Sequence, residues 1–222
     1  MLFRSRRVRD LRKELREKID AAEKSGEDLP MTAYTPPLAQ FVPKFQAAAA
    51  DYAGTDDAVR FLSWIARQGI DHDREAGKQA YVTLIDVHLQ SESFRRLATL
   101  LPGLPRYFDA AEARALIAKV EQNSTDSTVR AWAVLARLGD TLDKSAIDSD
   151  AFLTAKREMY AALEGVDDPY LRSMVGEKID LREKFAIGMV APDIVGIDID
   201  GVAFKLSDYK GKVIFLDFWG DW

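Results

Sequence analysis

The sequence predicts a mainly helical N-terminal domain of repeat-like hairpins, followed by the first β-strands of an incomplete α/β unit. Residues 1 to 185 are rich in Ala, Leu, Arg and Glu, whereas residues 190 to 222 are rich in Val, Ile, Phe, Asp and Gly. Apolar residues recur at helical spacing before this shift and form short runs between turn residues after it. The length of 222 residues accommodates two modest domains.

The chain opens with a predicted basic amphipathic helix over residues 1–26. Apolar residues at steps of three and four lie on one face, and Gly26 ends the helix. Its first 18 residues hold eight Arg or Lys against three acidic residues. Such a helix can bind an anionic membrane surface or acidic partner, or it can be a solvated helix that packs on its neighbour. We favour the second interpretation and expect no membrane contact by residues 1–22, because the stripe is narrow and lacks aromatic anchors.

A helical domain is predicted over residues 35–182. It begins with a hairpin, in which Pro43 lies near the start of the first helix, Gly54 ends that helix and Thr55 caps the second. Further helices are expected over Asp73 to His88, from Ser91 through Leu97 and Leu101 to Pro102, from a capping box of Asp109 with Glu112, and from about Asp126 and Asp150. Short loops favour stacked hairpins, but no clean repeat period is visible, so a repeat array and an irregular bundle both stay open.

Composition excludes several kinds of site. The chain has no cysteine, so these residues contain neither thiol catalysis nor thiolate metal ligands. Its two histidines, His72 and His88, are expected to be hydrogen-bonded or exposed, and we expect no metal and no cofactor. The net charge of -5 argues against nucleic-acid binding. With no apolar run of membrane-spanning length and no secretory signal pattern, we expect a cytoplasmic chain.

The last domain is predicted over residues 186–222. Ala191-Pro192-Asp193 breaks the helical pattern, Ile194 to Ile197 forms a β-branched run, and Asp198 to Gly201 forms a turn. Val202 to Leu206 pairs back as a strand, and Ser207 caps one helical turn. Val213 to Phe218 is a nearly continuous apolar run, which predicts a central strand covered on both faces.

This order of elements resembles the start of the thioredoxin-like redoxin family, which combines AhpC/TSA and TlpA-like thiol-disulfide oxidoreductases. Four pieces carry the resemblance in register: IGMVAPD over residues 187–193, DIDG over 198–201, LSDYKGK over 206–212, and VIFLDFWGDW over 213–222. In the family, the last piece runs directly into a Cys-x-x-Cys motif at a helix N-terminus. There the helix dipole lowers the thiol pKa and populates the thiolate needed for exchange.

The resemblance also implies roles for individual residues. Asp217 aligns with an acidic residue beneath the active site that moves a proton from the second cysteine, a task that suits a buried carboxylate with a raised pKa. Trp219, Gly220, Asp221 and Trp222 would flank the motif. Peroxidases of this family place Pro and Thr before a single cysteine, so Trp-Gly-Asp-Trp favours an oxidoreductase acting on protein thiols and disulfides.

The chain ends at Trp222, where the family places its attacking cysteine. Three accounts compete: a fragment or truncation, a true stop, or a selenocysteine codon read as a stop. On each account, we expect the chain as given to be an inactive part of an antioxidant or redox enzyme of bacterial type, whose relatives are often exported. The alternative is a helical interaction module that binds a protein partner and has no catalytic role.

Overall fold

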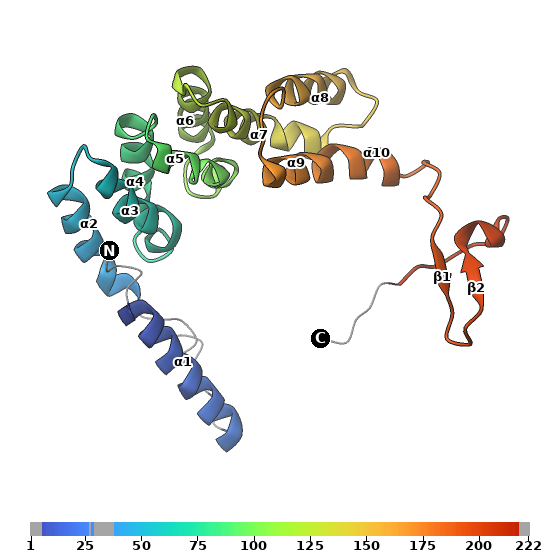
Figure 1. The fold of residues 1–222 in the computed structure, drawn as a ribbon, viewed down its shortest axis with the longest axis horizontal. Helices are drawn as coiled ribbons and strands as arrows, with labels where there is room; N and C mark the ends of the chain where they lie inside the picture. The colour runs from blue at the N-terminus through green and yellow to red at the C-terminus, as the bar shows by residue number, and fades with distance from the viewer. Residues whose placement is uncertain (1–5, 27, 29–37, 218–222) are drawn as a thin grey trace.

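The computed structural model describes residues 6–26, 28 and 38–217. The described chain is a row of helices followed by a small β-hairpin, as Figure 1 shows. The helical elements are α1 (Arg6–Ser25), η2 (Leu38–Phe41), α2 (Val42–Asp51), α3 (Asp56–Trp64), η3 (Ile65–Gly69), α4 (Arg74–Val87), α5 (Glu92–Arg95), η4 (Ala98–Arg106), α6 (Ala110–Asn123), α7 (Ser127–Lys144), α8 (Asp150–Ala162), α9 (Pro169–Gly176), η5 (Glu177–Leu181), α10 (Arg182–Phe185) and η6 (Leu206–Tyr209). The strands are β1 (Val195–Ile197) and β2 (Ala203–Lys205). A mainly helical domain followed by the start of a β region is therefore confirmed.

Most predicted helix starts are confirmed because aspartate side chains cap them. The Asp109 carboxylate accepts from the Glu112 backbone N–H at 2.8 Å, and the Glu112 carboxylate accepts from the Asp109 N–H at 3.2 Å. Asp73 and Asp126 cap α4 and α7 in the same way. Thr55 occupies the predicted N-cap position of α3, but its hydroxyl donates to the Tyr52 carbonyl and accepts from no N–H of the first turn of α3.

The predicted fourth helix also differs from the structure. Ser91 caps α5 as expected, but α5 ends at Arg95, and the chain continues as the 3-10 segment η4. Pro102 and Pro105 lie inside η4, where their missing N–H groups and fixed φ angles prevent an α-helical ladder. The apolar spacing still buries Leu97 and Leu101, so tertiary packing keeps the stripe while the backbone changes type.

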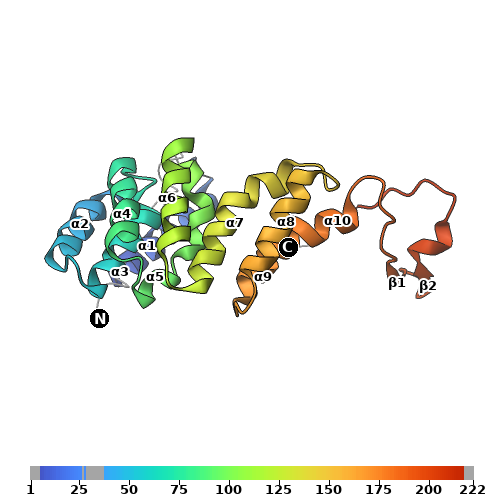
Figure 2. The same ribbon diagram turned by 90° about the horizontal axis from the view of Figure 1, so that it is seen from above.

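The helices stack in pairs, an arrangement that the sequence did not settle. Several polar contacts between neighbouring pairs join residues 33 to 36 positions apart. They include Arg74 to the Tyr107 carbonyl, Lys78 to Glu112, and the Trp132 indole to Asp168. Figure 2 shows the pairs following one another along the row. Of the two arrangements left open, the structure adopts the stacked array.

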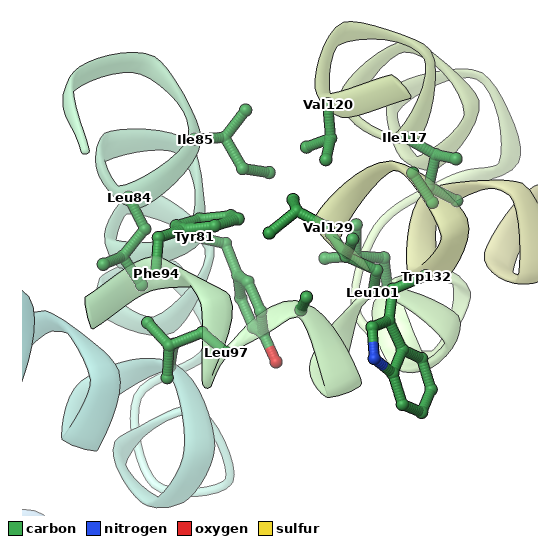
Figure 3. Packing of buried hydrophobic residues seen from close by; sticks show 14 of the residues in the cluster. Tyr81, Leu84, Ile85, Phe94, Leu97, Leu101, Ile117, Val120, Val129 and Trp132 are labelled. Atoms are coloured by element: carbon green, nitrogen blue, oxygen red, sulfur yellow. The ribbon is translucent and has the colours of Figure 1, made fainter. Parts of the chain in front are cut away.

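One continuous core runs through this array from Leu38 to Ile179. Figure 3 shows its centre, where side chains from α4, α5, η4, α6 and α7 interdigitate. The labelled residues are Tyr81, Leu84, Ile85, Phe94, Leu97, Leu101, Ile117, Val120, Val129 and Trp132. Among the described residues, none after Ile179 belongs to the core. The array therefore carries its own apolar interior, separate from the β-hairpin.

The strands form one antiparallel pair with Val195 opposite Lys205 and Ile197 opposite Ala203. This pairing confirms the predicted hairpin. The predicted strand over Val213 to Phe218 is not formed in its described part, residues 213–217, which are extended and exposed. Strand structure requires a hydrogen-bonded neighbour, and within the described chain no strand lies alongside this run.

Candidate functional site

The candidate site inferred from sequence lies in residues 186–222, of which the structure describes 186–217. One aspartate builds the turn of its hairpin. The Asp198 carboxylate accepts from the backbone N–H groups of Asp200 at 3.0 Å and Val202 at 2.8 Å. Gly201 donates its N–H to the Asp198 carbonyl and has a φ of 81°, which a side chain would strain. The predicted Asp-Ile-Asp-Gly turn therefore fixes the hairpin by local hydrogen bonds.

A second aspartate ties the entrance of the hairpin to its exit. The Asp193 carboxylate accepts from the Ser207 backbone N–H at 2.8 Å and from the Ser207 hydroxyl at 2.8 Å. These hydrogen bonds lower the pKa of Asp193, because they favour the ionised carboxylate. Ser207 was expected to cap η6; instead Asp208 accepts from the Lys205 N–H at 3.0 Å. Sequence reasoning missed this role of Asp193, because its partner lies 14 residues away.

Gly196 lies in β1 directly against the ring of Phe204 in β2. A Cβ atom at position 196 would lie 3.0 Å from Cε1 of that ring, which is closer than side chains normally pack. The glycine thus allows the aromatic ring to cover the backbone of its partner strand. This leaves Val195 and Ile197 as the exposed apolar residues of β1.

Asp217 is exposed at the end of the extended run. Two apolar residues before it, Val213 and Phe215, have exposed fractions of 103% and 91%. Trp219, Gly220, Asp221 and Trp222 lie outside the described residues. Asp217 is thus the only candidate site residue within the described part of the chain, and its proton-relay role stays a prediction.

Within the described ranges, no group of three or more His, Asp or Glu side chains is placed to hold a metal ion. No described helix combines the length and apolar character needed to cross a bilayer. His72 is exposed, as expected, but His88 is 5% exposed and its ring makes no hydrogen bond to any described residue. No fully buried side-chain N or O atom of the described residues lacks a partner, so the expectation for His88 stays a prediction.

The chain is partly similar to known thiol-disulfide oxidoreductases. It is 50% identical over 41 residues to thiol-disulfide oxidoreductase ResA of Bacillus thuringiensis subsp. konkukian, which covers 18% of this chain and 24% of the relative. Identity is 54% over 37 residues to ResA of Geobacillus kaustophilus (17% and 21%) and 46% over 41 residues to ResA of Bacillus subtilis (18% and 23%). The chain thus spans about a quarter of the length of these curated relatives.

No protein-family model matches the chain. No solved structure matches it either. The short matches to ResA therefore carry the comparison, and their identity of about half over some forty residues is well above chance similarity. They support a thioredoxin-like, redoxin-type relationship for this chain.

Proposed function

We propose that this chain joins a helical array to the first part of a redoxin domain, in a protein that exchanges thiols and disulfides with protein substrates. The observation that carries the proposal is the partial identity with the ResA proteins. We assign the matching stretch to the C-terminal segment, because the four family-like pieces lie there in register. The hairpin supports this assignment, since Asp193 and Asp198 hold its entrance and turn in one fixed geometry.

The chemistry requires a group that the 222 residues do not contain. Disulfide exchange proceeds by attack of a thiolate or selenolate on a sulfur atom, and the chain has no cysteine. We propose that residues following Trp222 supply the attacking group in a Cys-x-x-Cys or selenocysteine-x-x-Cys motif. In that full-length form, Asp217 accepts the proton of the second cysteine, and Trp219 to Trp222 flank and shield the motif.

Expression of two chains tests the proposal. The chain as given should not accelerate the reduction of insulin disulfides by dithiothreitol, whereas the product extended through the next codons should. Activity should disappear when the first motif residue of the extended product is replaced by Ser. An in-frame UGA followed by two codons and a Cys codon would support selenocysteine, and any other continuation would exclude it.

The proton-relay role of Asp217 has its own test in the extended product. Asp217→Asn should slow resolution of the mixed disulfide by about 100-fold, with a changed pH profile, because the base is removed. Asp200→Asn is the matched control, since Asp200 is an exposed turn residue of the same segment. Equal effects of the two changes would contradict the relay.

A helical interaction module is the second candidate function. It is favoured by the array's own continuous core, to which the described hairpin contributes nothing. An extended product that folds but shows no exchange activity would support this candidate over the redox proposal.

A further inference from the structure

The seam between α4 and α6 is closed by polar contacts. Lys78 pairs with Glu112 at 2.9 Å, and Lys119 pairs with Asp86 at 2.7 Å. At the end of the seam, the Gln90 amide donates to the Asn123 carbonyl at 2.7 Å. These side chains reach across from one helix to the next and join the two pairs.

The equivalent seam between α2 and α4 is open. A groove of about 290 Å³ lies there, with walls from α2 and α4 and a floor from Ala58, Leu62 and Ile65. We call it the α2–α4 groove, and Figure 2 shows the position of the two helices in the row. Alanines line it where the neighbouring seam has ion-pairing residues, and none of its described lining residues is Lys, Arg, Asp or Glu. The remaining lining residues are Gln46, Ala49, Ala50, Ala53, Gly54, Ala76, Gln79, Ala80, Thr83, Val87 and His88.

His88 supplies an unpaired polar group to this groove. Its side chain is 5% exposed, lines the groove, and hydrogen-bonds no described residue. No fully buried side-chain N or O atom of the described residues lacks a partner, so the ring nitrogens of His88 retain some accessible surface. Burial lowers the pKa of His88, opposed in part by the charge of Asp56, which favours the neutral ring at physiological pH. A neutral imidazole presents one donor and one acceptor.

Uncharged polar side chains also line the two walls of the α2–α4 groove. Gln46 lies on the α2 wall, and Gln79 and Thr83 lie on the α4 wall, where the Gln79 amide donates to the Thr83 hydroxyl at 3.5 Å. Carboxamide side chains pair well with peptide groups, because each offers both a donor and an acceptor. A lining without formal charge disfavours an ionic ligand, since a buried ion would find no counter-charge there. The volume suits a few aliphatic side chains.

We propose that the α2–α4 groove binds an extended, uncharged peptide segment of a partner protein. Its aliphatic side chains occupy the space over Leu62 and Ile65, and a peptide group pairs with His88. Stacked helix pairs expose extended surfaces of this kind, and a peptide can continue along them beyond the groove. This binding site is independent of the redox proposal, so failure of one leaves the other standing.

The test uses the full chain and short peptides that are acetylated, amidated and built only from Gly, Ala, Val, Leu and Gln. Binding is followed by titration and by the chemical shifts of the His88 ring nitrogens. Ala50→Trp should weaken binding by about tenfold or more, because an indole from this exposed lining position fills the groove. Ala47→Trp is the matched control, since Ala47 is exposed on the same helix but does not line the groove. It should change affinity by less than about twofold.

Three results would overturn the proposal: no binding by any uncharged peptide, equal weakening by the two tryptophans, or unshifted His88 ring nitrogens at saturation. Peptides of the same length with central Glu or Lys should bind more weakly, and equal binding would also count against it. In a parallel titration, hexanol serves as a small apolar probe of the same groove. Saturation by hexanol without peptide binding would identify a small apolar ligand site instead.

Discussion

Gly77 lies at the end of the first turn of α4 and is expected to resist replacement by alanine. A Cβ atom there would overlap Cβ and Cγ1 of Ile70 and lie 2.7 Å from its Cα. Helix propensity alone favours alanine over glycine by about 1 kcal/mol. Overpacking costs about 1–3 kcal/mol, and a backbone atom in the contact places this site at the upper end, because Cα cannot rotate away. The free energy of unfolding should therefore fall by about 1–2 kcal/mol, the difference of these two effects.

Gly139 in α7 provides the matched control. A Cβ atom at position 139 would have Cε of Lys178 as its nearest neighbour, at 3.8 Å, which is ordinary contact with a flexible side chain. Gly139→Ala should therefore stabilise the fold, by up to about 1 kcal/mol. Urea unfolding followed by helical circular dichroism measures both variants. A Gly77→Ala protein as stable as the parent would refute the close-packing argument.

Three further changes test contacts of the array by the same unfolding assay. Asp168→Ala should cost about 1–2 kcal/mol, because one carboxylate both caps α9 and accepts from the Trp132 indole at 2.9 Å. Arg137→Lys should lower the free energy of unfolding by about 0.5–1 kcal/mol. Lysine lacks the branched guanidinium that pairs with the partly exposed carboxylates of both α6 and α8. Burial lowers the pKa of His88 below 6.5, so the unfolded chain binds the proton more readily. Stability should fall as pH drops below about 6.5 and be unaffected by this group above it.

Each of these changes has a control in the same chain. Asp167→Ala removes the exposed neighbour of Asp168 and should be nearly neutral. The effect of Arg137→Lys should shrink in high salt, and an effect independent of salt would contradict an ionic origin. His88→Gln should flatten the stability profile between neutral and mildly acidic pH, because it removes the group whose pKa burial lowers.

Sequence reasoning succeeded where the deciding contacts are local. The caps of Asp73, Asp109 and Asp126 involve residues two or three positions away, so a short pattern specifies them. The Asp198 turn and the pairing of its flanking strands are local for the same reason. The Ser91 hydroxyl caps α5 as predicted, whereas the Thr55 hydroxyl donates to the Tyr52 carbonyl instead of accepting from the first turn of α3.

Predictions from sequence failed where contacts between distant segments determine the local structure. A strand was expected after Lys212, yet an apolar run becomes a strand only when another strand pairs with it. The two prolines of η4 changed the helix type while leaving its apolar stripe buried. His88 has no sequence signal for an unpaired ring, because its surroundings come from α2 and α3 as well as α4.

The sequence by itself determined the order and type of most elements, the hairpin, and the family resemblance of the last residues, because each depends on spacing within a short stretch. Only the tertiary structure decided how the helix pairs stack on one another, since contacts such as that of Lys78 with Glu112 join residues far apart in the sequence. It also decided which seam is closed and which is open. Ion pairs across one seam and alanines along the next follow no short-range pattern, and their effect appears only when the helices are packed together.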